Sequence, residues 1–143
     1  MKKLKITFGL LLLFCLSVVA AETSFVENFS SSLPTYWQST AQYTLSVQNG
    51  ELNIKVAKNA KWSQFQVTLP QTLDLSANPF VSLKARISKS ARILIYLVDA
   101  ANQNYPLHTR ILYSENGYSN ILFDFTNAAS TVDLTQITKL YIG

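Results

Sequence analysis

The sequence is poor in the residues that cross-link or interrupt a chain. It has one cysteine, one histidine, four glycines and four prolines among 143 residues. Cys15 lies inside an apolar N-terminal run, so the rest of the chain can form no disulfide and can use no cysteine as a nucleophile or metal ligand. Stability must therefore come from a hydrophobic core. With 48% hydrophobic and 12% aromatic residues, the chain is neither disordered nor of low complexity.

The N-terminus has the layout of a secretory signal peptide. Three lysines precede a short apolar run, residues 6–21, which ends in the small residues Ala20 and Ala21. The run is shorter than the roughly 20 apolar residues of a comfortable membrane span. Without these lysines the formal net charge falls from +4 to about +1, which argues against a nucleic-acid partner. We expect a signal peptide at 1–21, export to a periplasmic or extracellular location, no membrane attachment after cleavage, and one domain at 22–143.

Apolar residues alternate with a period of two along the rest of the chain, and no stretch keeps a helical pattern for three turns. The clearest case flanks Asn49-Gly50, the strongest short hairpin signal. A two-residue turn there pairs the apolar residues of both strands on one face. The expected pairs are Tyr43 with Val56, Leu45 with Ile54 and Val47 with Leu52.

Six further strands are expected at residues 65–69, 80–87, 92–98, 107–113, 120–125 and 137–142. Pro70 ends the first of these. Residues 92–98 are apolar on both faces, which is typical of a central strand, and Asp99 then opens a polar loop. Short strands at this spacing predict an all-β, antiparallel sandwich or barrel. The strand-like ending at 139–143 indicates either an edge strand or a chain cut before its domain closes, and we favour the second.

Six segments carry a resemblance to a known family. They are FVENFSSSLPTYW (25–37), YTLSVQNGELNIKV (43–56), KWSQFQVTLPQTLDLSANPFVSLKARI (61–87), RILIYLVDAANQ (92–103), NILFDFTN (120–127) and VDLTQITKLYIG (132–143). Their order resembles the jelly-roll, galactose-binding-like β-sandwich of carbohydrate-binding modules attached to secreted bacterial glycoside hydrolases. The resemblance implies a fused or associated catalytic domain. It also implies a closing strand with an acidic residue, which this sequence lacks, and a structural calcium with Glu27 as its early ligand.

Sugar binding requires aromatic platforms beside planar polar side chains that form paired hydrogen bonds. Strand alternation predicts one shared outward face with five such residues: Lys84, Arg86, Tyr96, His108 and Arg110. Trp62, in a polar loop that enters a strand, is a further candidate platform. Each residue also has an ordinary interpretation. Charged residues are common on any solvent-exposed sheet face, and Tyr96 and Trp62 are also typical of core packing. A lone histidine is more often structural or merely exposed.

The eight acidic residues are scattered without a local pair, and the sequence has no nucleophile-elbow, zinc-protease or phosphate-loop motif. We therefore expect a protein that is not an enzyme. The favoured function is a secreted, non-catalytic carbohydrate-binding module that holds a polysaccharide or oligosaccharide near a glycoside hydrolase. The alternative is a secreted structural or adhesion β-sandwich with a protein partner.

Overall fold

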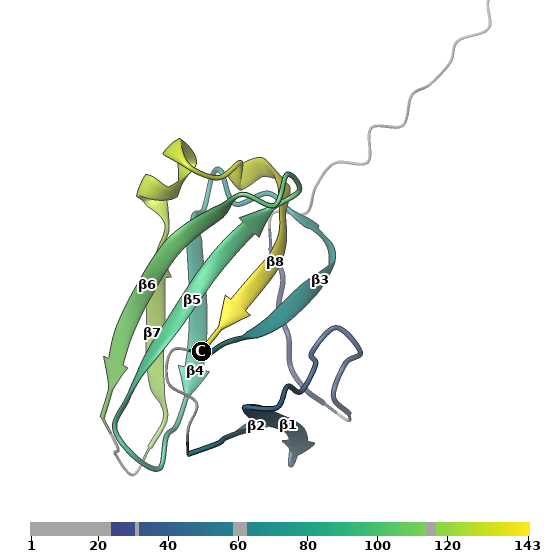
Figure 1. Cartoon of the computed structure of the whole chain (residues 1–143), viewed down its shortest axis with the longest axis vertical. Helices are drawn as coiled ribbons and strands as arrows, with labels where there is room; N and C mark the ends of the chain where they lie inside the picture. Colours follow the sequence, from purple (N-terminus) through teal and green to yellow (C-terminus); the bar gives the residue numbers. More distant parts are fainter. Residues whose placement is uncertain (1–23, 31, 59–62, 114–116) are drawn as a thin grey trace, which may run out of the picture.

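The computed structural model describes residues 24–30, 32–58, 63–113 and 117–143 (Figure 1). The predicted signal peptide at 1–21 and the predicted platform Trp62 lie outside these residues. The description also leaves out the side chains of residues 106–109, which include His108. Within the described part the protein is all-β, and none of its helical turns is long and apolar enough to cross a membrane.

The described chain forms eight strands in three antiparallel sheets. The strands are β1 (Tyr43–Gln48), β2 (Glu51–Val56), β3 (Phe65–Leu73), β4 (Phe80–Ala85), β5 (Ala91–Asp99), β6 (Asn104–Leu112), β7 (Ser119–Asp124) and β8 (Ile137–Ile142), with the 3-10 turns η1 (Thr126–Ser130) and η2 (Leu134–Gln136) before β8. One sheet has the order β3-β8-β5-β6, β4 pairs with β7, and β1 pairs with β2. Figure 1 shows β4 and β7 behind the four-stranded sheet, an arrangement consistent with the predicted β-sandwich.

The β1–β2 hairpin is confirmed in its predicted register. Tyr43 pairs with Val56, Leu45 with Ile54 and Val47 with Leu52. Asn49 and Gly50 have φ angles of 53° and 76°, and a type I′ turn requires positive φ at both central positions. The buried Tyr43 anchors the hairpin, because its hydroxyl donates a hydrogen bond to the carbonyl of Ser63 at 2.6 Å.

Strand β3 continues past Pro70, where the sequence predicts its end. Its pairing with β8 is regular from Phe65 to Thr68 and shifts register before Leu73. Because β3 lies at the edge of the four-stranded sheet, Pro70 falls in an irregular stretch of an edge strand. A proline is tolerated there, since its missing N–H removes no regular ladder bond.

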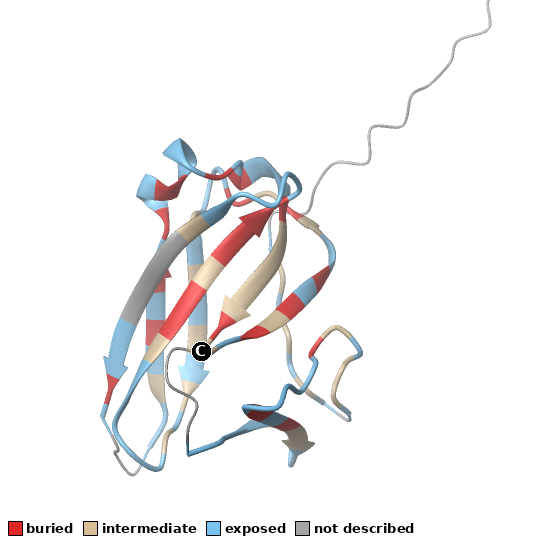
Figure 2. Cartoon of the chain, viewed as in Figure 1, coloured by how far each residue is buried: buried red, intermediate tan, exposed pale blue. Residues whose placement is uncertain are grey.

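Strand β5 is central, as predicted, and lies between β8 and β6. Ile95 and Leu97 belong to the core, while Leu94 and Val98 on the other side of the strand are also buried (Figure 2). Strand β8 lies between β3 and β5. The edge-strand interpretation of residues 137–142 is therefore wrong.

Asp99 is buried, whereas the sequence suggests the start of an exposed loop. It is the last residue of β5 and only 3% exposed. Its Oδ1 accepts a hydrogen bond from the backbone N–H of Gln103 at 2.9 Å, and its Oδ2 accepts one from the N–H of Asp133 at 2.9 Å. These bonds satisfy the buried carboxylate and tie the β5–β6 turn to the segment before β8.

The hydrophobic core lies between the four-stranded sheet and the β4–β7 sheet. Its largest fully buried side chains come from both layers and the segments beside them: Phe65, Val67, Ile95, Leu97, Phe123, Phe125 and Ile137. Trp37, which precedes these strands, is also buried. Its ring centroid lies 5.0 Å from that of Phe29, edge to face, and 6.0 Å from that of Phe65. The N-terminal segment therefore covers one border of the core.

Two neighbouring residues of β7 test this assignment of layers. Phe123 is fully buried, whereas Leu122 is 53% exposed. We expect Phe123→Ala to lower the free energy of unfolding by about 3–5 kcal/mol, because it removes buried contacts and leaves a cavity. Leu122→Ala should change it by less than about 1 kcal/mol. Urea unfolding followed by tryptophan fluorescence measures both values, and equal losses would contradict the assignment.

Candidate functional site

The fold divides the predicted sugar-binding residues between two layers. Lys84 lies on β4 and Arg86 follows directly after it, in the two-stranded sheet. Tyr96, His108 and Arg110 lie on β5 and β6 of the four-stranded sheet. The expectation that all five share one face is therefore wrong. Alternation shows which residues share a side of one strand, but it does not show which strands share a sheet.

The register of β6 also separates Tyr96 from the other two residues of its sheet. Ile93 pairs with Arg110, and Ile95 pairs with His108. Directly paired residues lie on the same side of an antiparallel sheet, so both β6 positions lie on the side of Ile95. Tyr96 follows Ile95 in β5 and lies on the opposite side.

Exposed apolar residues explain this error of phase. Alternation within residues 107–113 turned Ile111 and Tyr113 inward and Leu112 outward, whereas Ile111 and Tyr113 are 56% and 66% exposed and Leu112 is buried in the core. A bulge in β6, where the pairing steps from Ile95 with His108 to Leu97 with Tyr105, lies before these residues and leaves their register regular.

Tyr96 instead forms a row with residues of β8 and β3. It pairs with Tyr141, and Tyr141 pairs with Gln66. All three side chains are half-buried, and they lie on the outer side of the four-stranded sheet because the paired positions next to them belong to the core. Tyr96, Tyr141 and Gln66 are hereafter the tyrosine row.

Hydrogen bonds hold the polar groups beside these rings. The Tyr141 hydroxyl donates to Gln66 Oε1 at 2.7 Å, and Gln66 Nε2 donates to Thr68 Oγ1 at 2.7 Å. On the same side of β8, Lys139 Nζ donates to Asn102 Oδ1 at 2.9 Å. The surface thus combines two aromatic rings with an amide, a hydroxyl and an ammonium group, and none of these residues is acidic.

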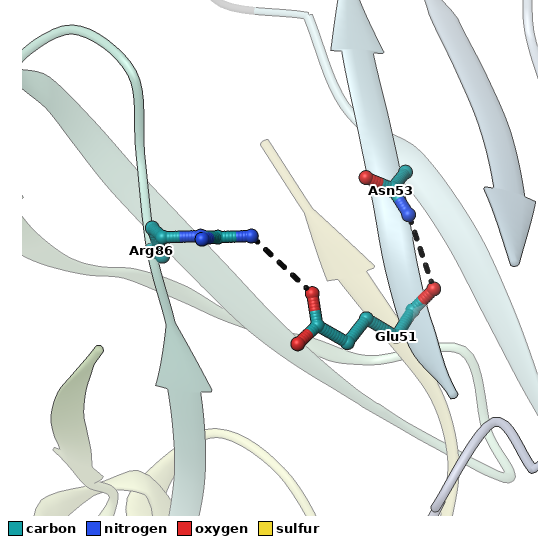
Figure 3. A network of polar contacts seen from close by, with 3 residues as sticks. All are labelled: Glu51, Asn53 and Arg86. Carbon is teal, nitrogen blue, oxygen red and sulfur yellow. Dashed lines mark hydrogen bonds and ion pairs between the residues drawn. The ribbon is translucent and has the colours of Figure 1, made fainter. Parts of the chain in front are cut away.

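On the other layer, Lys84 and Arg86 gather around Tyr118, which is 42% exposed. Lys84 Nζ lies 5.4 Å from the centroid of the Tyr118 ring, and the central guanidinium carbon of Arg86 lies 5.1 Å from it. Arg86 also forms an ion pair at 3.5 Å with Glu51 of the hairpin (Figure 3). A hydrogen bond with Glu51 raises the pKa of Tyr118 above its usual value.

Sequence reasoning missed Tyr141, Gln66 and Glu51 as surface partners. The alternation of residues 137–142 contains the signal for Tyr141, but its use requires knowledge that this strand pairs with β5. Glu51 reaches Arg86 from the hairpin, 35 positions away in the chain. No local sequence pattern predicts a contact between residues so far apart in the chain.

Glu27, the predicted calcium ligand, is engaged in hydrogen bonds. Its Oε1 accepts one from the backbone N–H of Phe29 at 3.0 Å, and its Oε2 accepts one from the hydroxyl of Tyr36. Among the residues that the structure describes, no group of three or more His, Cys, Asp or Glu could hold a metal ion. Glu27 thus has two hydrogen-bond partners in the described structure, and its role as a calcium ligand stays a prediction.

Comparisons with known proteins identified no relative. No family model matches the chain, and searches of curated proteins and of solved structures also gave no match.

The contact between Tyr36 and Glu27 predicts a dependence of stability on alkaline pH. Burial, followed by the hydrogen bond to Glu27, raises the pKa of Tyr36 from 10.0 to about 12. The stability linked to this raised pKa is complete below pH 10 and is lost as the pH rises toward 12. We expect a late step near pH 12 in a titration of tyrosinate absorbance, with a parallel fall in the free energy of unfolding.

Three variants assign that step. Tyr36→Phe should abolish it. Glu27→Gln should move it to lower pH without abolishing it, because the burial of Tyr36 remains. Tyr113→Phe removes a tyrosine that is 66% exposed and should leave the late step intact. A late step that survives in Tyr36→Phe would contradict the assignment.

Proposed function

We propose that this protein is a secreted, non-catalytic carbohydrate-binding module of the jelly-roll type, which holds a polysaccharide near an associated glycoside hydrolase. The observation that carries the proposal is the tyrosine row. Sugar rings present flat faces of C–H groups together with hydroxyls, and an aromatic surface flanked by planar polar groups is complementary to both. Tyr96 and Tyr141 supply the aromatic surface, and Gln66 supplies the amide.

The tyrosine row is a preformed surface. Directly paired residues of antiparallel strands have Cβ atoms about 5 Å apart, so Tyr96 and Tyr141 lie side by side. The hydrogen bonds from Tyr141 to Gln66 and from Gln66 to Thr68 hold the amide in one orientation. A preformed surface loses less side-chain entropy when a ligand binds.

The acidic residues support a role without bond chemistry. A glycoside hydrolase needs two carboxyl groups across a cleft. Three of the described aspartates instead accept hydrogen bonds from the backbone N–H two residues further on and so stabilise local turns: Asp74 from Ser76, Asp124 from Thr126 and Asp133 from Thr135. Asp99 is buried and holds two loops together.

One feature favours the alternative, a structural or adhesion domain with a protein partner. Strand β4 pairs with β7 along one edge, and within the described ranges no strand pairs with its other edge. That edge borders a broad groove between β4, the β1–β2 hairpin and residues 24–29. The half-buried side chains of Val81, Leu83 and Ala85 line it. An extended segment of a partner protein could add a strand at such an edge.

Affinity electrophoresis tests the proposed function. We expect soluble β-glucan, mannan or xylan in the gel to retard the protein, or an insoluble glucan to capture it. Tyr96→Ala and Tyr141→Ala should each weaken that binding about tenfold, because each removes one ring from the surface. Trp62→Ala extends the test to the predicted platform outside the described residues.

Tyr118→Ala is the matched control for these neutral glycans, since it removes a tyrosine from the other layer and should leave the affinity for them unchanged. Circular dichroism and urea unfolding confirm that each variant is folded. Equal weakening in Tyr96→Ala and Tyr118→Ala would overturn the tyrosine row as the site. A folded protein that binds none of these glycans would overturn the proposed function and favour the alternative.

A further inference from the structure

Among the described residues, a group of aspartates and a group of exposed cations lie at opposite ends of the strands. Four aspartates lie at one end of the sheets: Asp74, Asp99, Asp124 and Asp133. The register defines this end, because Asp124 pairs with Phe80 at the start of β4 and Asp99 pairs with Ile137 at the start of β8. The opposite end, where β4 ends and β5 begins, carries four exposed cations: Lys84, Arg86, Lys89 and Arg92. These four residues and Tyr118 are hereafter the basic end.

Among the described residues, the basic end has one weakly bound acidic partner, Glu51. The ion pair between Arg86 and Glu51 is long, at 3.5 Å, and its side chains are 57% and 45% exposed. Such an exposed pair contributes little to stability and is easily exchanged. The ammonium of Lys84 contacts the ring of Tyr118 and has no carboxylate partner within the described part of the chain. A contact with a ring does not neutralise its charge.

Lys84 and Arg86 also repel one another. Lys84 lies near the end of β4 and Arg86 one position beyond that end, and both lie against the Tyr118 ring. Two cations on one ring, of which Arg86 has one weakly bound carboxylate partner, form a site that favours an incoming anion. Arg86 can grip a carboxylate or sulfate with two parallel N–H groups, and Lys84 adds a point charge.

We propose that the basic end binds the carboxylate or sulfate groups of an acidic polysaccharide, as a second contact separate from the tyrosine row. The anion takes the place of Glu51 at Arg86, Tyr118 contacts the adjoining sugar ring, and Lys89 and Arg92 bind the next charged groups. The choice of a polysaccharide among anionic polymers rests on the proposed function.

The form of the surface also disfavours double-stranded nucleic acid. That ligand is recognised by a basic face or helix on a strongly basic domain. Here the cations are grouped at the strand ends around one aromatic ring, and four aspartates occupy the other end of the same sheets. The acidic polysaccharide is the smaller and better matched ligand for this surface.

The full chain is assayed for binding to polygalacturonate, dextran sulfate, neutral β-glucan and single-stranded DNA, at low ionic strength and at about 0.3 M salt. We expect Lys84→Gln/Arg86→Gln to weaken binding to one or both acidic polysaccharides at least tenfold and to leave binding to neutral glucan unchanged. High salt should weaken binding to the acidic polysaccharides and leave binding to neutral glucan unchanged. Binding that is lost in the double variant for polygalacturonate only identifies the carboxylate as the ligand, and binding lost for dextran sulfate only identifies the sulfate. Loss for both polysaccharides shows that either group is bound.

Lys55→Gln/Lys58→Gln removes the same charge outside the basic end and is the control. Three outcomes would overturn the inference. The first is an equal loss of affinity in this control, and the second is unchanged binding of the acidic polysaccharides in the double variant at positions 84 and 86. The third is tighter binding of DNA than of either polysaccharide. Binding of neutral glucan without any acidic polysaccharide would overturn the inference and leave the tyrosine row standing. Acidic binding that depends on Lys84 and Arg86, without neutral binding, would support the basic end and overturn the tyrosine row.

Discussion

The pairing of β8 with a neighbour along both of its edges is the constraint on which the rest of the structure depends. Strand β3 lies on one side of it and β5 on the other. The two registers align an inner row and an outer row across three strands: Phe65, Ile142 and Ile95 inside, and Gln66, Tyr141 and Tyr96 outside. A slip of one residue in either pairing would exchange the rows, moving core side chains into water and polar ones into the core. The burial of the inner row thus fixes the outward position of the tyrosines.

The two ends of the sheets use charge in different ways. At the end with the aspartates, carboxylates bind the backbone of neighbouring turns, and Asp99 joins the β5–β6 turn to the approach to β8. At the basic end, Arg86 forms an exposed ion pair with Glu51, and Lys84 and Arg86 each contact the ring of Tyr118. Carboxylates that stabilise turns have a structural role of their own. Among the described residues, the cations of the basic end have one weakly bound acidic partner, Glu51, and we therefore connect them to a ligand.

The sequence was informative wherever one short segment contained the whole physical signal. Asn49-Gly50 determined both the turn and the register of the hairpin, because a two-residue turn leaves no freedom of alignment. The apolar faces of residues 92–98 indicated a central strand for the same local reason. The phase of residues 107–113 was predicted wrongly because Ile111 and Tyr113 are apolar but exposed, and Arg110 was chosen on that phase. Tyr96 was selected correctly as an outward residue, but its neighbours in space come from β8 and β3.

The most direct test of the central claim is a nuclear magnetic resonance titration of the labelled chain with cellohexaose, mannohexaose and xylohexaose. We expect the backbone amide signals of Gln66, Tyr96 and Tyr141 to shift together with a hexasaccharide that binds, while those of β4 and β7 stay in place. Shifts confined to β4 and β7, or shifts at Tyr96 without Tyr141, would contradict a binding surface built by β8 and both of its neighbours.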